Sequence, residues 1–371
     1  MRRNNVAGLI FSNMHDEQMR ELTAVRTMAG VPFGSRYRLI DFMLSGMVNS
    51  GITKVGVITK SNYRSLMDHL GSGKAWDLSR KRDGLVILPP YGEGNALYMS
   101  RIEALKSVFN FLKHSPEDYI LMTDSDCVAN FDFTKLISHH FETDSDVTIV
   151  YKYGRIPDNT PDNIVLGINL DHTINNIEVS PNVEGECNFG LNIYMFKKDY
   201  LIRIVEDAVA RGATHFGRDV LQTNIKNGKY TAFSFDTYIG VIHSLESYYE
   251  VSMDLLKDDV RSQVFPNGRP IYTKDKDDMP TKYGLSSNVR NSVLADGCII
   301  EGEVENSVIF RGVKIGKGTK VKNSIIIQGT YIGENCTLDS VITDKDVIIK
   351  DGRTFMGHKT YPVFINKNRV V

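Results

Sequence analysis

The sequence predicts an α/β domain with a mostly parallel sheet, followed by a smaller parallel β-helix. Two observations predict this order. Over roughly the first 250 residues, short aliphatic runs alternate with amphipathic helical stretches, which is the pattern of βαβ units. From about residue 288 the helical pattern ends and aliphatic residues recur every six positions between glycines, which is typical of a hexapeptide β-helix. A chain of 371 residues is long enough for two such domains.

Five strands are expected in the first domain, because short apolar runs are bounded there by glycine, proline, aspartate or serine. They span residues 6–11, 55–59, 85–88, 119–122 and 147–151. Four apolar side chains share one face of an expected helix between the third and fourth of these strands: Ile102, Leu105, Phe109 and Leu112. A later helix is expected from its N-cap Ser244 to about Leu256. Sheets of this kind bind ligands beyond the carboxyl ends of their strands, so residues that follow strands are the candidates for chemistry.

The composition changes after about residue 265. Two polar stretches, at residues 265–270 and 274–280, look like a linker, although a long surface loop would read the same way. We predict a first domain over 1–265, a linker over 266–287 and a β-helix over 288–371. The six-residue spacing is carried by Val293, Ile299, Ile315, Val321, Ile327, Ile332, Leu338, Val341 and Val347. Chance spacing in an ordinary β domain is the alternative. Solenoids expose flanks that stack, so an oligomer is also expected.

Charge and cysteine content exclude several classes of protein. The 44 Lys and Arg nearly balance 45 Asp and Glu, which argues against a strongly basic nucleic-acid binder but allows a local basic pocket. No apolar run reaches the roughly 20 residues that span a bilayer, and the first residues read as a buried strand rather than a signal peptide. The four cysteines have no metal-binding spacing and are expected to be reduced thiols: Cys127, Cys187, Cys298 and Cys336. We therefore expect a cytoplasmic protein without membrane or nucleic-acid partners.

Several motifs occur in an order that is specific to one family. They lie at residues 26–34, 37–42, 49–52, 91–96, 126, 216–220 and 244–256. In this order they resemble the bacterial glucose-1-phosphate adenylyltransferases (ADP-glucose pyrophosphorylases), and the resemblance covers nearly the whole chain. It implies a Rossmann-like nucleotidyltransferase domain, a left-handed β-helix, and the synthesis of ADP-glucose from ATP and glucose 1-phosphate.

The loop after the first strand departs from that family. The reaction brings two polyanions together, so it needs backbone N–H groups around the phosphates, cationic side chains, and carboxylates that hold Mg²⁺. Active members carry a GGxGxRL loop there, whereas residues 13–19 of this chain read NMHDEQM and contain no glycine. Gln18 stands where the family has a phosphate-binding arginine, and Asp16 and Glu17 would repel phosphates.

Three further positions lack the side chains that the resemblance implies. Met28 stands in place of the catalytic lysine of the family's RAKPA block, and Ser180 in place of the lysine that holds the sugar phosphate. Tyr238 lies in the segment that should supply the second metal carboxylate. Asp126 remains as the first carboxylate, but a single carboxylate is a poor Mg²⁺ site. We therefore predict no catalytic residue, metal or cofactor in this chain, with Mg²⁺ bound by an active partner.

The pattern is similar to the D-type subunit that some bacteria pair with an active C-type subunit in a heterotetramer that serves glycogen synthesis. The resemblance implies a regulatory partner that is inactive or nearly so. In active relatives, arginines at the positions of Arg26 and Arg38 help to bind an anionic effector, and Arg36 is close to them in sequence. We predict effector binding by Arg26, Arg36 and Arg38 together with an unassigned part of the β-helix. The alternative is that these arginines pair with neighbouring acids such as Asp41.

Two other functions are left open by the sequence. An active nucleotidyltransferase with a rearranged site would need substitute cations near Asp126, and Arg20 and Lys60, which follow early strands, are candidates. A hexapeptide-type acyltransferase would usually place a histidine in the solenoid. The only histidine after residue 250 is His358, which follows the last clear coil, so this reading is disfavoured.

The remaining polar candidates have ordinary structural interpretations. Asp124 is expected to cap the turn after its strand. His139 and His140 are expected at the end of a surface helix, because no other ligand lies at a recognised spacing.

Overall fold

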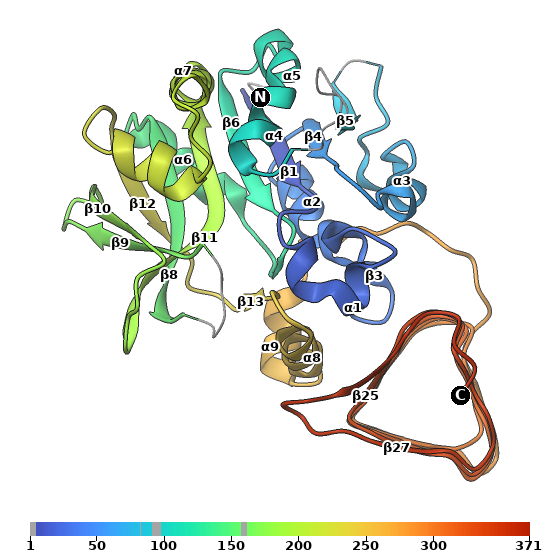
Figure 1. Cartoon of the computed structure of the whole chain (residues 1–371). Helices are drawn as coiled ribbons and strands as arrows, with labels where there is room; N and C mark the ends of the chain where they lie inside the picture. The colour runs from blue at the N-terminus through green and yellow to red at the C-terminus, as the bar shows by residue number, and fades with distance from the viewer. Residues whose placement is uncertain (1–4, 82, 91–97, 157–161) are drawn as a thin grey trace. The chain divides into compact units, whose positions relative to one another are not determined.

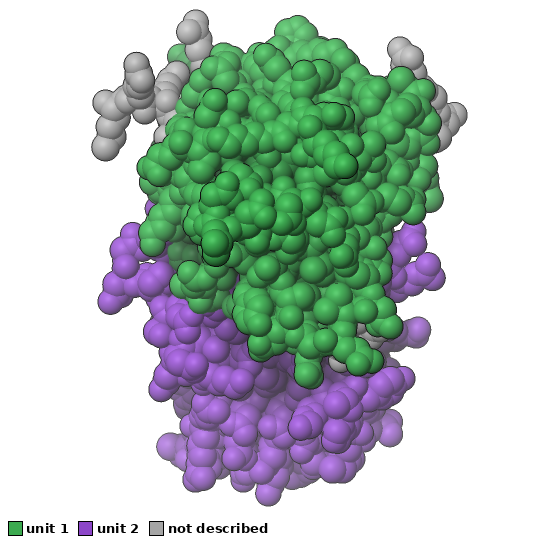
Figure 2. Space-filling model, turned by 90° about the vertical axis from the view of Figure 1, so that its left-hand side faces the viewer, with its two compact units in different colours: residues 1–14, 42–125, 130–237 green, residues 15–41, 126–129, 238–371 purple. Residues whose placement is uncertain are grey.

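A computed structural model describes residues 5–81, 83–90, 98–156 and 162–371, so the predicted motif at 91–96 lies outside the described residues. The chain forms two compact units, drawn in two colours in Figure 2. Unit 1 comprises residues 1–14, 42–125 and 130–237. Unit 2 comprises residues 15–41, 126–129 and 238–371. The predicted boundaries at residues 265 and 288 stay a prediction.

Unit 1 is built on a nine-stranded sheet whose main path runs β10-β9-β11-β6-β1-β4-β5, with β8 and β12 continuing from β11 (Figure 1). Strands β1, β4, β5 and β6 are parallel, and β11 runs antiparallel to β6. All six residues of β1 are buried, as its apolar sequence predicts for a central strand. The strands are β1 (Val6–Phe11), β4 (Lys54–Ile58), β5 (Gly84–Leu88), β6 (Tyr119–Asp124), β8 (Val147–Arg155), β9 (Ile164–Ile168), β10 (Ile174–Val179), β11 (Glu186–Lys197) and β12 (Tyr230–Ser234).

The helices of unit 1 bury apolar faces against this sheet. Ile102, Leu105 and Leu112 lie in the main core, as predicted, but two short helices divided at Val108 replace the expected single one. None of the helices in the described part of the chain is long and apolar enough to span a bilayer. The helices are α2 (Leu39–Asn49, which starts in unit 2), α3 (Arg64–Leu70), η3 (Lys74–Trp76), α4 (Arg101–Ser107), α5 (Phe109–His114), α6 (Phe133–Glu142), α7 (Lys198–Ala210) and the π-helical η4 (Phe216–Gln222).

The prediction that His140 ends a surface helix is wrong. His140 lies on the buried face of α6, where its Nδ1 is 2.7 Å from the Thr148 hydroxyl. Burial, and then the nearby charge of Lys197, lower the pKa of His140 to about 4. The ring is therefore neutral at ordinary pH and belongs to the core. The sequence of α6 mixes apolar and polar residues, so it did not show whether the His140 ring would face the core or the solvent.

Unit 2 contains a group of short elements besides its solenoid. Ser244 caps α8 as predicted, and its hydroxyl accepts a hydrogen bond from the Ser247 N–H in a capping box. From the same helix, Tyr249 donates to the carbonyl of Asn323 at 2.6 Å and so joins α8 to the solenoid. The elements are η1 (Asp16–Met19), α1 (Arg20–Thr23), η2 (Met28–Gly30), β2 (Pro32–Phe33), β3 (Tyr37–Arg38), β7 (Cys127–Val128), β13 (Gly240–Val241), α8 (Leu245–Asp254) and α9 (Asp258–Val264).

The solenoid consists of three parallel sheets of five strands each, which wind as a triangular coil (Figure 1). Residues of the six-residue pattern, among them Ile315, Val321, Ile332 and Leu338, form its core. The predicted order, an α/β domain followed by a parallel β-helix, is confirmed. The first sheet contains β14 (Lys282–Tyr283), β17 (Ile299–Ile300), β20 (Lys314–Ile315), β23 (Tyr331–Ile332) and β26 (Ile348–Ile349). The second contains β15 (Asn288–Arg290), β18 (Glu303–Glu305), β21 (Lys320–Lys322), β24 (Thr337–Asp339) and β27 (Thr354–Met356). The third contains β16 (Val293–Leu294), β19 (Val308–Ile309), β22 (Ile325–Ile326), β25 (Val341–Thr343) and β28 (Val363–Ile365).

Candidate functional site

A side-chain hydrogen bond ties the loop after β1 to the segment that follows it. The Asp16 carboxylate accepts a hydrogen bond from the Met28 backbone N–H at 2.7 Å, which ties η1 to η2. Gln18 lies exposed on η1, and the Met28 side chain is buried. The two positions where active relatives are expected to carry cations therefore hold a surface amide and a core thioether. Neither side chain can neutralise phosphate charge.

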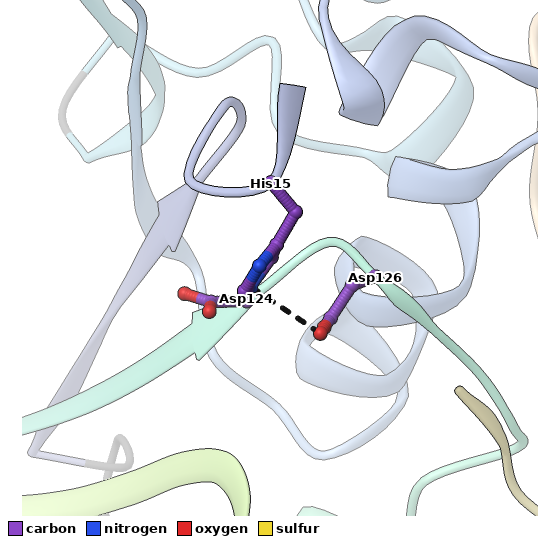
Figure 3. A group of neighbouring side chains, drawn as sticks. All are labelled: His15, Asp124 and Asp126. Carbon is purple, nitrogen blue, oxygen red and sulfur yellow. Dashed lines mark ion pairs between the residues drawn. The ribbon is translucent and has the colours of Figure 1, made fainter. Parts of the chain in front are cut away.

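The Asp126 carboxylate lies beside a histidine of that loop. His15 Nε2 lies 3.4 Å from Asp126 Oδ2, and both side chains are nearly buried (Figure 3). The Asp126 carbonyl accepts the Ile242 N–H at 2.8 Å, which fixes the backbone beside the carboxylate. His15 is a partner that the sequence did not reveal, because a histidine in a loop carries no signal of what it will contact.

Asp124, at the end of β6 in unit 1, does more than cap a turn. It accepts two hydrogen bonds from the guanidinium of Arg101, at 2.7 and 2.6 Å. The carboxylate is buried in a bidentate ion pair, which the expectation of a strand-end cap did not include.

Tyr238 and Ser180, where the resemblance implies other side chains, also make local contacts. The Tyr238 hydroxyl donates to Asp254 of α8 at 3.0 Å. Burial, followed by the negative charge of Asp254, raises the pKa of Tyr238, so the phenol stays neutral. Ser180 is exposed in a left-handed turn, with φ at 48°, and its N–H donates to the Asn163 carbonyl.

The donors present do not fit Mg²⁺, the metal that the family implies. Mg²⁺ prefers an octahedral set of oxygen ligands, usually with one or two carboxylates. Within unit 2, Asp126 is paired with His15, and position 238 offers a phenol bonded to Asp254. Within unit 1, Asp124 is paired with Arg101. The Asp124 carboxylate is neutralised by Arg101, and the Asp126 carboxylate already has His15 as its neighbour.

The two substitute cations that a rearranged site would require belong to different units of the chain. Lys60 Nζ is 5.6 Å from the centre of the Tyr98 ring in unit 1, and the Tyr98 hydroxyl donates to Asn13 at 2.8 Å. Arg20 is exposed at the start of α1 in unit 2.

The three predicted effector-binding arginines have different environments within unit 2. Arg26 is buried, and its guanidinium donates to both carboxylate oxygens of Asp344 at 2.9 Å. Arg36 is exposed, with its guanidinium carbon 5.9 Å from the centre of the Tyr37 ring. Arg26 therefore pairs with Asp344 and not with the nearby Asp41. Asp41 instead accepts a hydrogen bond from the backbone N–H of Arg38 at 3.0 Å.

The charge of Arg38 acts on two lysines from the C-terminal part of unit 2. Burial, and then the positive charges of Arg38, Arg26 and Lys276, lower the pKa of Lys345 to about 7. The pKa of Lys276 is likewise lowered, by burial and then by Arg311 and Arg38. The charges of these cations therefore act on one another within unit 2. No local motif in the sequence links Lys276, Arg311 or Lys345 with Arg38, which is far from them along the chain.

Comparison with known proteins places this geometry in a family. Residues 9–258 match the model described as Nucleotidyl transferase, and residues 279–360 match GlmU-like, C-terminal hexapeptide. A glucose-1-phosphate adenylyltransferase of Bacillus cytotoxicus is 30% identical over 365 residues, which is 97% of this chain and 96% of that protein. The chain belongs to the glucose-1-phosphate adenylyltransferase family. The family resemblance predicted from the motifs is thereby confirmed.

Within the glucose-1-phosphate adenylyltransferase family, the chain is also similar to proteins named for glycogen biosynthesis. The glycogen biosynthesis protein GlgD of Bacillus subtilis (strain 168) is 36% identical over 368 residues, covering 99% of this chain and 97% of that protein. GlgD of Geobacillus stearothermophilus is 39% identical over 323 residues, covering 86% of this chain and 83% of that protein. The predicted likeness to the D-type proteins is confirmed.

Proposed function

We propose that this chain is a non-catalytic regulatory subunit of a heteromeric glucose-1-phosphate adenylyltransferase that makes ADP-glucose for glycogen biosynthesis. Its partner would be a catalytic subunit of the same family, in a heterotetramer, and that partner would bind Mg²⁺ with ATP and glucose 1-phosphate. Similarity to the GlgD glycogen biosynthesis proteins supports the pathway. Similarity to a glucose-1-phosphate adenylyltransferase supports the class of partner.

One observation carries the non-catalytic part of the proposal: the side chains at the substrate positions make internal contacts. Asp126 pairs with His15, Tyr238 with Asp254, and Asp16 with the Met28 N–H. A catalytic site keeps its charged groups directed at the substrate, where they act on charge that develops in the transition state. These groups instead stabilise loops and a helix.

The regulatory part of the proposal rests on the cations of unit 2. We place a small anionic effector, such as a phosphorylated metabolite, against Arg36, Arg38 and Lys345. Holding partly desolvated like charges close together is unfavourable in free energy. A bound dianion would lower that free energy by pairing with the cations. Arg26 acts here by neutralising Asp344, which would otherwise oppose the anion.

Anion binding at this site is expected to weaken by roughly tenfold as the pH rises from 6 to 8. Lys345 loses its proton around pH 7, so the site then loses one positive charge, and a charge-assisted contact is worth about 1.5–3 kcal/mol. Calorimetric titration with sulfate, whose charge is constant over this range, measures the effect at fixed ionic strength. Lys345→Met should flatten the pH profile and weaken binding at pH 6.

A matched control is Lys317→Met, which removes an exposed lysine of the same solenoid. It should leave both the affinity and its pH dependence as in the unmodified chain. An unchanged pH dependence in Lys345→Met would show that Lys345 does not contact the anion.

The proposal as a whole is tested by mixing the purified chain with an active glucose-1-phosphate adenylyltransferase. Complex formation, seen by light scattering, and a changed response of ADP-glucose synthesis to anionic effectors are the expected results.

A further inference from the structure

Arg101 lies in unit 1 where four segments meet. Arg101 is the first residue of α4, Asp124 ends β6, Phe11 ends β1 and Phe216 begins η4. Strands β1 and β6 are parallel neighbours, and Phe11 and Asp124 lie opposite each other in their register. The carboxyl ends of adjacent parallel strands are where open α/β sheets bind ligands.

The Arg101 side chain has the contacts of a receptor for an oxyanion. Its two terminal nitrogens donate to the two oxygens of Asp124 at 2.7 and 2.6 Å, in the planar bidentate geometry that guanidinium also uses for phosphate. Its guanidinium carbon lies 4.8 Å from the centre of the Phe11 ring and 5.6 Å from that of Phe216. Two aromatic rings therefore hold the cation, in an environment that leaves the Arg101 side chain 10% exposed.

We propose that Arg101 is a latent phosphate-binding residue whose site the chain occupies with its own Asp124 carboxylate. The carboxylate presents two oxygens to the guanidinium, as a phosphate group would, and so it acts as a built-in substitute for an anionic ligand. To bind, a phosphate would have to displace the Asp124 carboxylate from the guanidinium. Because this carboxylate belongs to the same chain, its effective concentration beside Arg101 is high. The site is thereby closed to free phosphates. This inference uses contacts in unit 1 alone and does not rest on the proposed regulatory function.

An ordinary buried ion pair would contain the same two residues, so the test must separate the two cases. In an ordinary pair, the cation is held by its partner and moves when that partner is neutralised. In a receptor, other groups hold the cation, here the two phenyl rings and the start of α4. Neutralising Asp124 should then leave a guanidinium in place that binds an added anion.

The experiment is calorimetric titration of the full chain and its variants with inorganic phosphate. Asp124→Asn is expected to bind phosphate roughly 10- to 100-fold more tightly at the new site than the unmodified chain does, the range for a charge-assisted bidentate contact. The double variant Arg101→Met/Asp124→Asn should lose this gain. The cations of unit 2 are identical in every variant, so phosphate bound there gives the same background and cancels in the comparison.

Asp207→Asn is the control for removing a carboxylate from an arginine pair. Asp207 pairs with Arg211 on α7 at 2.8 Å, and both side chains are about half exposed. This variant should gain no phosphate affinity. If folded Asp124→Asn gains none either, Arg101 is an ordinary ion-pair residue and the proposal is wrong.

Neutralising Asp124 could also prevent folding, so thermal unfolding provides a second measurement. Phosphate that binds the folded state raises its melting temperature, even for a weakened variant. Asp124→Asn and Asp124→Ser should both be stabilised by phosphate more than the double variant is. Equal phosphate stabilisation of the single and double variants would overturn the proposal, while the mixing experiment on the regulatory role would be unaffected.

Discussion

Purified alone, the chain is expected to form ADP-glucose at less than about 10⁻³ per second, against roughly 1–1,000 per second for typical enzymes. The reaction needs cations on the phosphates and carboxylates on the metal. Gln18 and Met28 supply no cation, and Asp126 is paired with His15. Each missing electrostatic contact typically costs about 100- to 1,000-fold in rate, so several together leave little activity even when their effects are not additive. The measurement is product formation with ATP, glucose 1-phosphate and Mg²⁺.

An active glucose-1-phosphate adenylyltransferase in the same assay is the positive control. Met28→Lys tests the explanation further. It should leave the rate at background, because one restored cation does not rebuild the loop after β1 or release Asp126. A rate in the range of ordinary enzymes for the unmodified chain would support the alternative of an active, rearranged site.

Arg26→Met is expected to lower the free energy of unfolding of unit 2 by about 3–5 kcal/mol, the usual cost of leaving one member of a buried ion pair without its partner. Arg26 and Asp344 are each only 2% exposed, and the guanidinium satisfies both carboxylate oxygens. Replacing both residues, in Arg26→Met/Asp344→Leu, should recover most of the loss, because an apolar pair leaves no buried charge. Urea unfolding followed by circular dichroism measures each variant.

The exposed pair Lys113–Glu206, at 2.7 Å, is the matched control, since both side chains are about half exposed. Lys113→Met should cost at most about 1 kcal/mol. A cost that small for Arg26→Met as well would show that the Arg26–Asp344 pair does not hold unit 2 together.

The elements that the sequence predicted are those whose signals are local. The six-residue spacing of residues such as Val321 and Leu338 needs no distant partner to be recognised, and these side chains form the solenoid core. The same holds for Ser244, whose capping role follows from the residues of one helical turn. The division of the expected 102–112 helix at Val108 was not predicted, because both halves continue the same apolar face.

The contacts of the candidate sites could not be predicted, because they join distant residues. Arg26 and Asp344 are 318 positions apart, so the choice between Asp344 and the nearby Asp41 depended on the fold. Lys345 likewise reaches Arg38 only through folding of unit 2. The sequence predicted which family side chains are replaced, and the structure shows the contacts of the residues at two of these places: Tyr238 anchors α8 and Asp16 ties η1 to η2.

ADP-glucose synthesis by an active glucose-1-phosphate adenylyltransferase, titrated with this chain at several concentrations of a phosphorylated effector, distinguishes a regulatory subunit from an enzyme. We predict that the chain adds no turnover of its own, binds the active subunit, and changes the response of that subunit to the effector. The double variant Arg36→Ala/Arg38→Ala should bind the active subunit but lose the change in effector response. Turnover that rises in proportion to the added chain when the active subunit is absent would contradict the account.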